Sequence, residues 1–545
     1  MSLGLSKQVH LYAVDTSAFY DEPEMYIHRR MLKLYQLRNK IKKRMSSKKI
    51  DYSYEKWKVE SINRVLKKEK NKLTEILDNK AGQKIIRKLN PEIAKDKNVI
   101  SLFESSTVRG LNLKINSLTE DFFVVNVYFF QVFENLVKNG FTYKGEKYIF
   151  FCASAGQIRT KKALFIKESS YYKIDKQISC GLSIEEINKR DGCNPNKYMA
   201  YLSLSNSATD LWEEFDIDKS IVVEDFETNV FGDVDFIDDK TYEITRRNME
   251  VPVPHMDGAG IMLEGPTRMC RLPWVKGLMI QFPFDKFIKE KCLNGKSVIK
   301  DIYGKEHNIL EEDIRYIFTK SQFKMWKYYD SWEEYKYNFK KYNCQACYCN
   351  IEENYIPNAR INYQMLQTLT DMTDREIEKL VGPTIEEIDK IGNDYQTTMS
   401  LLGVVETNSN PSYMQQALMI YPELLRDKYN REIIIDVKKS LIKNAKAGKL
   451  RVNGGYRFIS PDLYAFCEWL FLGIEKPRGL LANGEVYCSG FSNNSELACL
   501  RSPHLYREWA IRKNKRDEEI DKWFGMTQCI YSSCHDLISK VLQFD

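Results

Sequence analysis

Three cysteines near the middle of the chain have a spacing that metal sites use. Cys344, Cys347 and Cys349 form a C-x-x-C-x-C string. Cysteine thiolates bind Zn²⁺ tetrahedrally and also hold iron–sulfur clusters, but either kind of site needs a fourth ligand. The chain has no second C-x-x-C string, and its 6 histidines are scattered. The string is therefore compatible with a metal site and with three reduced structural thiols, and we favour the thiols.

Short catalytic signatures are otherwise scarce. Asp257-Gly258-Ala259-Gly260 is a D-G-x-G string, which occurs more often as a tight turn than as a reactive site. The sequence contains no Walker loop, no H-E-x-x-H and no G-x-S-x-G. No single motif therefore identifies a reaction.

Six weaker strings carry more information when they are read in order. In chain order they are Ser154-Ala155-Gly156-Gln157-Ile158-Arg159, Lys197-Tyr198-Met199-Ala200-Tyr201, His255-Met256-Asp257-Gly258-Ala259-Gly260, Arg271-Leu272-Pro273-Trp274-Val275-Lys276-Gly277, Ile361-Asn362-Tyr363-Gln364 and Leu500-Arg501-Ser502-Pro503-His504-Leu505. Together they resemble the ordered segments of the cellular, eukaryotic-type RNA-dependent RNA polymerase family and its bacteriophage-encoded single-chain relatives. The resemblance runs from about Tyr148 to Asp545 and leaves the first part of the chain outside it.

This resemblance implies an α+β fold with two double-psi β-barrels separated by a helical slab. The residue pattern agrees, because helical periodicity before Asn90 and again over Asn354–Ala447 alternates with β-rich stretches. The expected units are a helical basic head over 1–145, a mixed α/β region over 146–214, a first barrel over 215–345, the slab over 346–450 and a truncated second barrel over 451–545.

The resemblance also implies nucleotidyl transfer from ribonucleoside triphosphates on a nucleic-acid template. Such chemistry depends on positioned cations, because negative charge accumulates on the phosphates. The implied catalytic residues are Lys276, Arg271, Arg501 and Asp545. Lys276 would hold the triphosphate and Arg501 the ribose hydroxyls, although a strand-end lysine and a turn arginine are simpler alternatives. DNA and RNA templates are equally compatible with this pattern.

Two departures from the family pattern qualify the expected activity. The family's D-x-D-G-D motif, which holds Mg²⁺, would begin at Asp545, the last residue of the chain. One carboxylate is too few for hard cations that need several oxygen ligands, so we expect the chain alone to be inactive and not to bind Mg²⁺. In addition, Pro273 and Trp274 stand where the family has glycine. The alternative is a non-catalytic nucleic-acid-binding protein built on a degenerate polymerase scaffold.

The charge distribution points to the same class of partner. Residues Arg29–Lys97 contain 23 Lys and Arg against 8 Asp and Glu, a net charge of +15, so the rest carries −8 within the total of +7. Basic segments attract phosphate backbones, although a solvated helical face would have the same composition. The candidate nucleic-acid contacts are Lys42, Lys43, Arg44, Lys48, Lys49, Gln157 and Arg159; the last two could equally be structural.

Composition sets the remaining bounds. The 545 residues are 43% hydrophobic and 12% aromatic, enough for several cores. The most apolar stretch, Leu463–Ile474, is too short and too polar to span a bilayer. No signal peptide is apparent, and we expect the 13 cysteines to be reduced thiols of a cytoplasmic protein without a membrane partner. The oligomeric state stays open.

Overall fold

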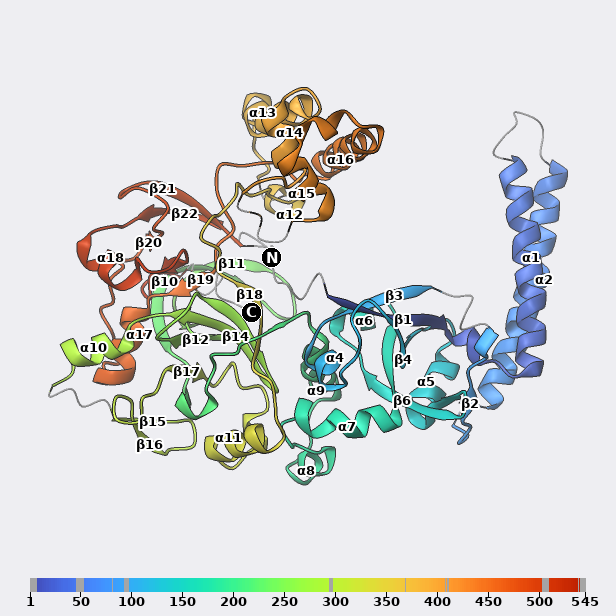
Figure 1. The fold of residues 1–545 in the computed structure, drawn as a ribbon, viewed down its shortest axis with the longest axis horizontal. Helices are drawn as coiled ribbons and strands as arrows, with labels where there is room; N and C mark the ends of the chain where they lie inside the picture. The colour runs from blue at the N-terminus through green and yellow to red at the C-terminus, as the bar shows by residue number, and fades with distance from the viewer. Residues whose placement is uncertain are drawn as a thin grey trace.

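The computed structural model is a mixed α+β fold. Figure 1 shows an N-terminal sheet with a projecting helical hairpin, a central body of two β-rich units, and a helical slab beside that body. None of the helices within the described ranges is both long and apolar enough to cross a membrane. The described residues are 7–45, 53–80, 82–92, 98–293, 298–367, 369–406, 408, 411–501, 509–537 and 539.

The N-terminal sheet has seven strands in the order β2-β5-β6-β7-β4-β1-β3. Its strands are β1 (Gln8–Asp15), β2 (Arg87–Lys88), β3 (Val99–Phe103), β4 (Leu118–Asn126), β5 (Phe141–Tyr143), β6 (Glu146–Cys152) and β7 (Lys162–Lys167). Successive side chains of a strand point to opposite faces, and β4 supplies both faces with large apolar groups. Phe123 packs under the helical hairpin, while Phe122 packs in the core shared with the central body. The sheet is therefore buried on both sides.

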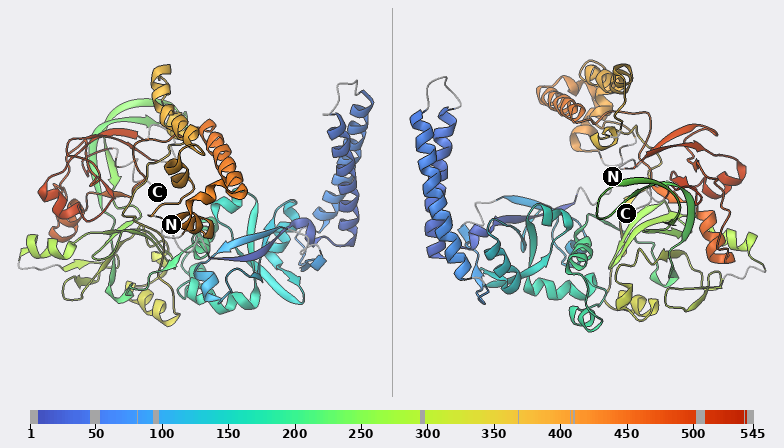
Figure 2. Two further views of the ribbon diagram at one scale, coloured as in Figure 1. Left: turned by 45° about the horizontal axis from the view of Figure 1, so that its top comes forward. Right: turned by 180° about the vertical axis from the view of Figure 1, so that it is seen from behind.

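Helices cover both faces of this sheet. On one face lie α1 (Glu22–Met45), α2 (Ser53–Asn79) and α5 (Phe130–Asn139), whose apolar residues form a core with Phe123 and Phe165. Toward the central body lie α4 (Ser106–Gly110), α6 (Ala155–Arg159), α7 (Glu168–Ile178), α8 (Ile184–Lys189) and α9 (Pro195–Leu202). The antiparallel helices α1 and α2 extend well beyond the sheet in every view (Figures 1 and 2).

The first β-rich unit is built on a second seven-stranded sheet, in the order β8-β18-β13-β14-β12-β17-β9. Its strands are β8 (Asp210–Leu211), β9 (Ser220–Val223), β12 (Ala259–Met262), β13 (Arg268–Leu272), β14 (Val275–Gln281), β17 (Tyr316–Thr319) and β18 (Cys347–Ile351). A long two-stranded ribbon, β10 (Glu227–Ile237) with β11 (Ile244–Pro254), and a short one, β15 (Val298–Lys300) with β16 (Glu306–Asn308), extend from it. Helices α10 (Phe284–Lys291) and α11 (Trp332–Lys341) complete the unit.

The second β-rich unit packs directly against the first. Its five strands are β19 (Ile459–Pro461), β20 (Glu485–Tyr487), β21 (Glu496–Leu500), β22 (Trp509–Asn514) and β23 (Ile530–Ser532), flanked by α17 (Leu463–Leu472) and α18 (Glu518–Phe524). One hydrophobic core joins the two units: Ile280 and Ile317 of the first sheet belong to the same cluster as Tyr464, Trp523 and Tyr531. The two units therefore share a buried seam.

The helical slab is attached through two chain segments. It contains α12 (Tyr363–Leu366), α13 (Asp374–Lys390), α14 (Tyr395–Leu401), α15 (Tyr413–Ile420) and α16 (Lys428–Lys446). Leu402 and Leu418 belong to a small core that draws only on slab residues. The connecting segments run antiparallel, since Ile361 N donates to Leu450 O at 2.9 Å and Val452 N donates to Ala359 O at 3.0 Å. Figure 2 shows the slab standing off the β-rich body.

Two expectations need correction. Residues 1–145 are not a helical head, because β1 to β5 belong to a sheet that continues through β6 and β7 past residue 145. The reason is non-local pairing: β1 lies parallel to β4, more than 100 residues later in the chain. The slab separates the two β-rich units in sequence only, since those units share one core in space.

Candidate functional site

Arg271 and Lys276 lie side by side on the β13–β14 hairpin. They are directly opposite in the antiparallel register, so their side chains leave the same face of the sheet. Met269 and Leu278, each two residues away, share that face and pack in or against the core common to both β-rich units. The two cations therefore lie on the face that the first unit turns toward the second, at the end of the hairpin that carries its turn.

The turn of this hairpin explains how Pro273 and Trp274 replace the expected glycines. Leu272 pairs with Val275, which leaves Pro273-Trp274 as a two-residue turn. Trp274 has φ of +62°, a conformation that usually favours glycine at this position. Its side chain is only 3% exposed, and its indole N–H donates to Ser179 O at 2.7 Å. Burial of the indole thus stabilises a turn that glycine would otherwise form.

Two of the glycine-containing strings meet in space. β12 and β14 are parallel neighbours, and Leu278 N donates to Gly258 O at 2.9 Å. A Cβ atom on Gly277 would lie 2.2 Å from Gly258 O. Gly258 itself has φ of +70° and its N–H donates to Ser321 Oγ at 2.8 Å. The D-G-x-G loop therefore contacts the backbone of β14 directly at Gly277, the residue after Lys276.

Sequence reasoning missed the polar segment that holds this contact in place. Lys276 N donates to Gln322 O at 3.1 Å, and the buried Gln322 Nε2 donates to Leu278 O at 3.1 Å. Ser321 N in turn donates to the carboxylate of Asp225, at 3.1 Å from each oxygen. The available signal was a polar run, Thr319-Lys320-Ser321-Gln322, directly after an apolar strand. These residues position the backbone of Lys276.

His255 lies at the start of the loop that contains the D-G-x-G string. It is 1% exposed, and its Nε2 lies 2.7 Å from Thr228 Oγ1. Burial, and to a smaller extent the nearby His535, lowers the pKa of His255 to about 3. The imidazole is therefore neutral at ordinary pH.

The other expected site residues are more dispersed. Arg501 follows the last residue of β21, the edge strand of the five-stranded sheet, and is half-buried. Gln157 closes a capping box with Ser154 at the start of α6: its Oε1 accepts from Ser154 N at 2.8 Å, and its N–H donates to Ser154 Oγ at 3.2 Å. Arg159 is exposed at the end of that helix. Asp545, Lys48 and Lys49 lie outside the described residues, so their expected roles stay predictions.

The three central cysteines take up separate contacts. Cys344 and Cys347 are buried, and Cys347 Sγ accepts from Arg109 Nη2 at 3.1 Å. Cys349 Sγ lies 3.7 Å from Met269 O. Among the described residues, no group of three His, Cys, Asp or Glu side chains could hold a metal ion. The described residues therefore do not assemble a Mg²⁺ or Zn²⁺ site among themselves.

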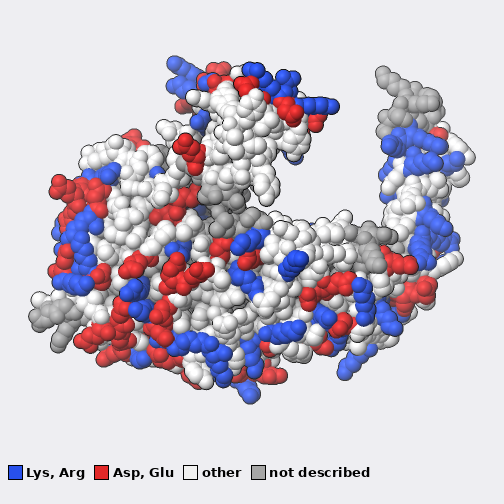
Figure 3. Space-filling view, in the orientation of Figure 1, with Lys and Arg blue, Asp and Glu red and all other residues white. Residues whose placement is uncertain are grey.

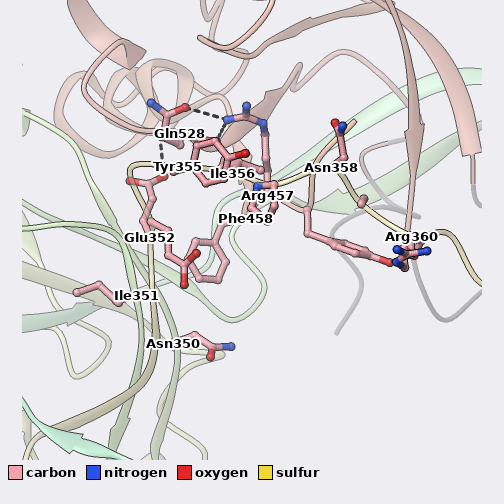
Figure 4. A pocket seen from close by; sticks show the side chains of 14 residues that line it. Asn350, Ile351, Glu352, Tyr355, Ile356, Asn358, Arg360, Arg457, Phe458 and Gln528 are labelled. Carbon is pink, nitrogen blue, oxygen red and sulfur yellow. Dashed lines mark hydrogen bonds between the residues drawn. The ribbon is translucent and has the colours of Figure 1, made fainter. Parts of the chain in front are cut away.

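A cavity of about 590 Å³ lies where β18 leads into the slab connection. Figure 4 shows Glu352, Arg457 and Gln528 on its wall. Glu352 Oε1 accepts from Gln528 N at 2.7 Å, and Arg457 Nη1 donates to Gln528 O at 2.8 Å. Burial raises the pKa of the Glu352 carboxyl above its usual value. These contacts connect the first unit, the slab connection and the second unit.

Basic side chains gather at a distance from the β13–β14 hairpin. In Figure 3 lysine and arginine cover much of the α1–α2 hairpin, whereas the outer side of the slab carries basic and acidic side chains together. The same view shows a broad opening between these two helical parts, with the N-terminal sheet as its floor. Lys42, Lys43 and Arg44 are exposed in the last turn of α1. The opening is thus flanked by a basic helical hairpin on one side and by a slab of mixed charge on the other.

A family model described as RNA dependent RNA polymerase matches residues 48–504. The chain belongs to this polymerase family. The match includes α2, the N-terminal sheet from β2 onward, and the first five strings, so it begins well before Tyr148, where the resemblance was expected to start. The β13–β14 hairpin with Arg271 and Lys276 lies within the matched region.

One relative of this chain is a longer protein. The chain is 48% identical over 546 residues to the DNA-directed RNA polymerase YonO of Bacillus phage SPbeta. That match covers 99% of this chain and 63% of the relative. The chain therefore spans somewhat less than two thirds of the length of that relative.

Proposed function

We propose that this chain forms part of a template-directed RNA polymerase, which transfers nucleotides from ribonucleoside triphosphates to an RNA 3′ end. The observation that carries the proposal is the placement of Arg271 and Lys276 on one sheet face. Beside them, Gly258 and Gly277 of two different strings are in close backbone contact. Two adjacent cations repel each other unless an anion lies between or above them, and a triphosphate is such an anion. Membership of the polymerase family supports the same chemistry.

In this proposal each β-rich unit has the double-psi β-barrel fold. The pairing of the first unit supports it, because β12 lies parallel to β14 while β13 forms a hairpin on the far side of β14. Lys276 binds the triphosphate, and Arg271 beside it adds a second positive charge facing the same phosphates. Arg501 selects the ribose. We infer a DNA template, since the relative with 48% identity is described as DNA-directed.

The proposal assigns Mg²⁺ to a carboxylate motif of which Asp545 is the first member. When bound, Mg²⁺ would neutralise charge on the reacting phosphates. In the proposal Asp545 contributes one of the three carboxylates that the family motif uses. This part of the proposal is tested by assaying the chain and a longer reading frame that contains it side by side.

The residue roles are tested by nucleotide binding to the 545-residue chain. Lys276→Ala should weaken ribonucleoside triphosphate binding about 10-fold or more, since a charge-assisted contact contributes about 1.5–3 kcal/mol. Lys289→Ala is the matched control, because Lys289 is exposed and pairs with Asp285 at 2.9 Å. In a longer protein that incorporates nucleotides, Lys276→Ala should abolish most of the activity. Equal binding and equal incorporation by the Lys276 variant would favour a non-catalytic nucleic-acid-binding protein.

A further inference from the structure

The outer half of the α1–α2 hairpin has no hydrophobic core of its own. All buried residues of α1 lie at or before Met31, and all those of α2 lie at or after Leu66. Residues 32–45 and 53–65, all of which are described, contain none. The two helices remain paired there, since Arg38 Nη1 donates to Asn63 Oδ1 at 3.3 Å. This outer half is an arm exposed to solvent.

The arm is strongly basic. Residues 32–45 and 53–65 contain 9 Lys and Arg against 2 Asp and Glu, a net charge of +7. Such a density attracts a polyanion and releases its counterions. Charge alone does not distinguish a duplex from a single strand, because both carry phosphates along their length.

Two exposed aromatic side chains add a second kind of contact. Tyr54 and Trp57 lie in the first turns of α2 and are 60% and 55% exposed. Their rings stack at 13°, with centroids 6.1 Å apart, and Lys58 Nζ lies 4.2 Å from the Tyr54 ring centroid. Because α1 and α2 are antiparallel, this pair lies at the same end of the arm as Lys42, Lys43 and Arg44.

We propose that this arm holds an unpaired nucleic-acid strand, with bases stacked on Tyr54 and Trp57 and phosphates beside the lysines of both helices. Base–aromatic stacking contributes about 1–3 kcal/mol per base and tolerates any base. In a duplex the base faces are already stacked on each other, so the aromatic pair discriminates in favour of single strands. The inference rests on the proposed polymerase function for the presence of a template, but not on the role of Lys276.

The test compares two probes on the 545-residue chain: a DNA single strand of about 12 nucleotides carrying 2-aminopurine, and its duplex. The parent should bind the single strand more tightly and quench its 2-aminopurine fluorescence. Tyr54→Leu combined with Trp57→Leu should weaken single-strand binding about 10-fold, remove most of the quenching and leave duplex affinity within about twofold. Tyr26→Leu, an exposed aromatic at the base of α1, is the matched control and should change neither probe.

A second variant separates stacking from charge. The triple variant Lys42→Gln, Lys43→Gln and Arg44→Gln should bind both the single strand and the duplex less tightly than the parent. Suppose that this charge variant binds both probes less tightly while the aromatic variant binds both as tightly as the parent. The stacking inference is then overturned, and the proposed nucleic-acid contact through the basic residues stands. Tighter binding of the duplex by the parent would also overturn the stacking inference. A further outcome is that poly-glutamate displaces the single strand from the parent and binds the aromatic variant less tightly. That result would assign the arm to an acidic protein partner. Nucleotide binding by Lys276→Ala reports independently on the polymerase site.

Discussion

The β13–β14 hairpin and the α1–α2 hairpin both present basic residues, but they hold them in different ways. Arg271 and Lys276 lie on a strand pair whose backbone is held by Gly258 and Gln322. Most lysines of the α1–α2 arm lie exposed on helical turns that contain no buried residue. The first arrangement fixes a charge at one point, whereas the second spreads charge over a surface. Point substitutions should therefore affect the two hairpins very differently.

The largest effect on stability at neutral pH is expected at Gly277. Gly277→Ala places a Cβ atom 2.2 Å from Gly258 O, a backbone atom that cannot rotate away. We expect the free energy of unfolding to fall by about 3 kcal/mol, as for severe overpacking. Urea denaturation of the parent and the variant measures this change. Gly454→Ala is the control, because its Cβ would meet nothing within 4 Å; similar losses for both variants would contradict the close contact.

An effect that is absent at neutral pH and appears only in acid is expected from His255, which lies in the same loop. Its pKa is lowered to about 3 in the folded protein, mainly by burial, against about 6.5 when unfolded. Between these values the unfolded chain binds a proton that the folded protein does not bind. Stability should therefore fall by about 1.4 kcal/mol per pH unit as the pH drops from 6.5 toward 3, with no such contribution above 6.5.

The measurement is a series of urea denaturations from pH 7 to pH 4 on the parent and on His255→Gln. Other groups titrate over this range in both proteins, so only the difference between them reports on His255. The stability advantage of the parent should shrink as the pH falls. A constant difference would mean that His255 is protonated in the folded protein and that the loop beside Lys276 is open to water.

The smallest effect on stability is expected on the arm. Replacing Lys42, Lys43 and Arg44 by glutamine should change the free energy of unfolding by no more than about 0.5 kcal/mol, as is usual for surface positions. The same variant should also weaken nucleic-acid binding. The slope of log binding constant against log salt concentration should become shallower, by up to about 0.9 for each phosphate that the variant no longer neutralises. Fluorescence anisotropy at several salt concentrations measures both changes. A large loss of stability would contradict the contrast between the two hairpins.

Much of the element order was predictable from local patterns. The helical periodicity expected before Asn90 agrees with α1 and α2, and that expected over Asn354–Ala447 agrees with the helices of the slab. Capping residues mark other helix starts, such as Ser183 before α8 and Thr373 before α13. These features depend on residues close together in the chain, so periodicity and propensity report them directly.

Non-local pairing could not be predicted in the same way. The eight residues of β1 form a sheet only because β4, far along the chain, lies parallel to them, and the expected helical head was wrong for that reason. Trp274 in a glycine-like turn is another case: the substitution looked like a departure from the family pattern until Ser179 O proved to accept its indole N–H.

The sequence by itself determined the polymerase family, the order of helical and β-rich parts, and the basic character of the N-terminal segment, because each of these is encoded in residue types and their order. Tertiary structure alone decided that Arg271 and Lys276 share one sheet face, that Gly258 and Gly277 meet, and that Gln322 holds the backbone between them. Such contacts join segments tens of residues apart, and their geometry depends on strand register and close packing, which no local pattern specifies.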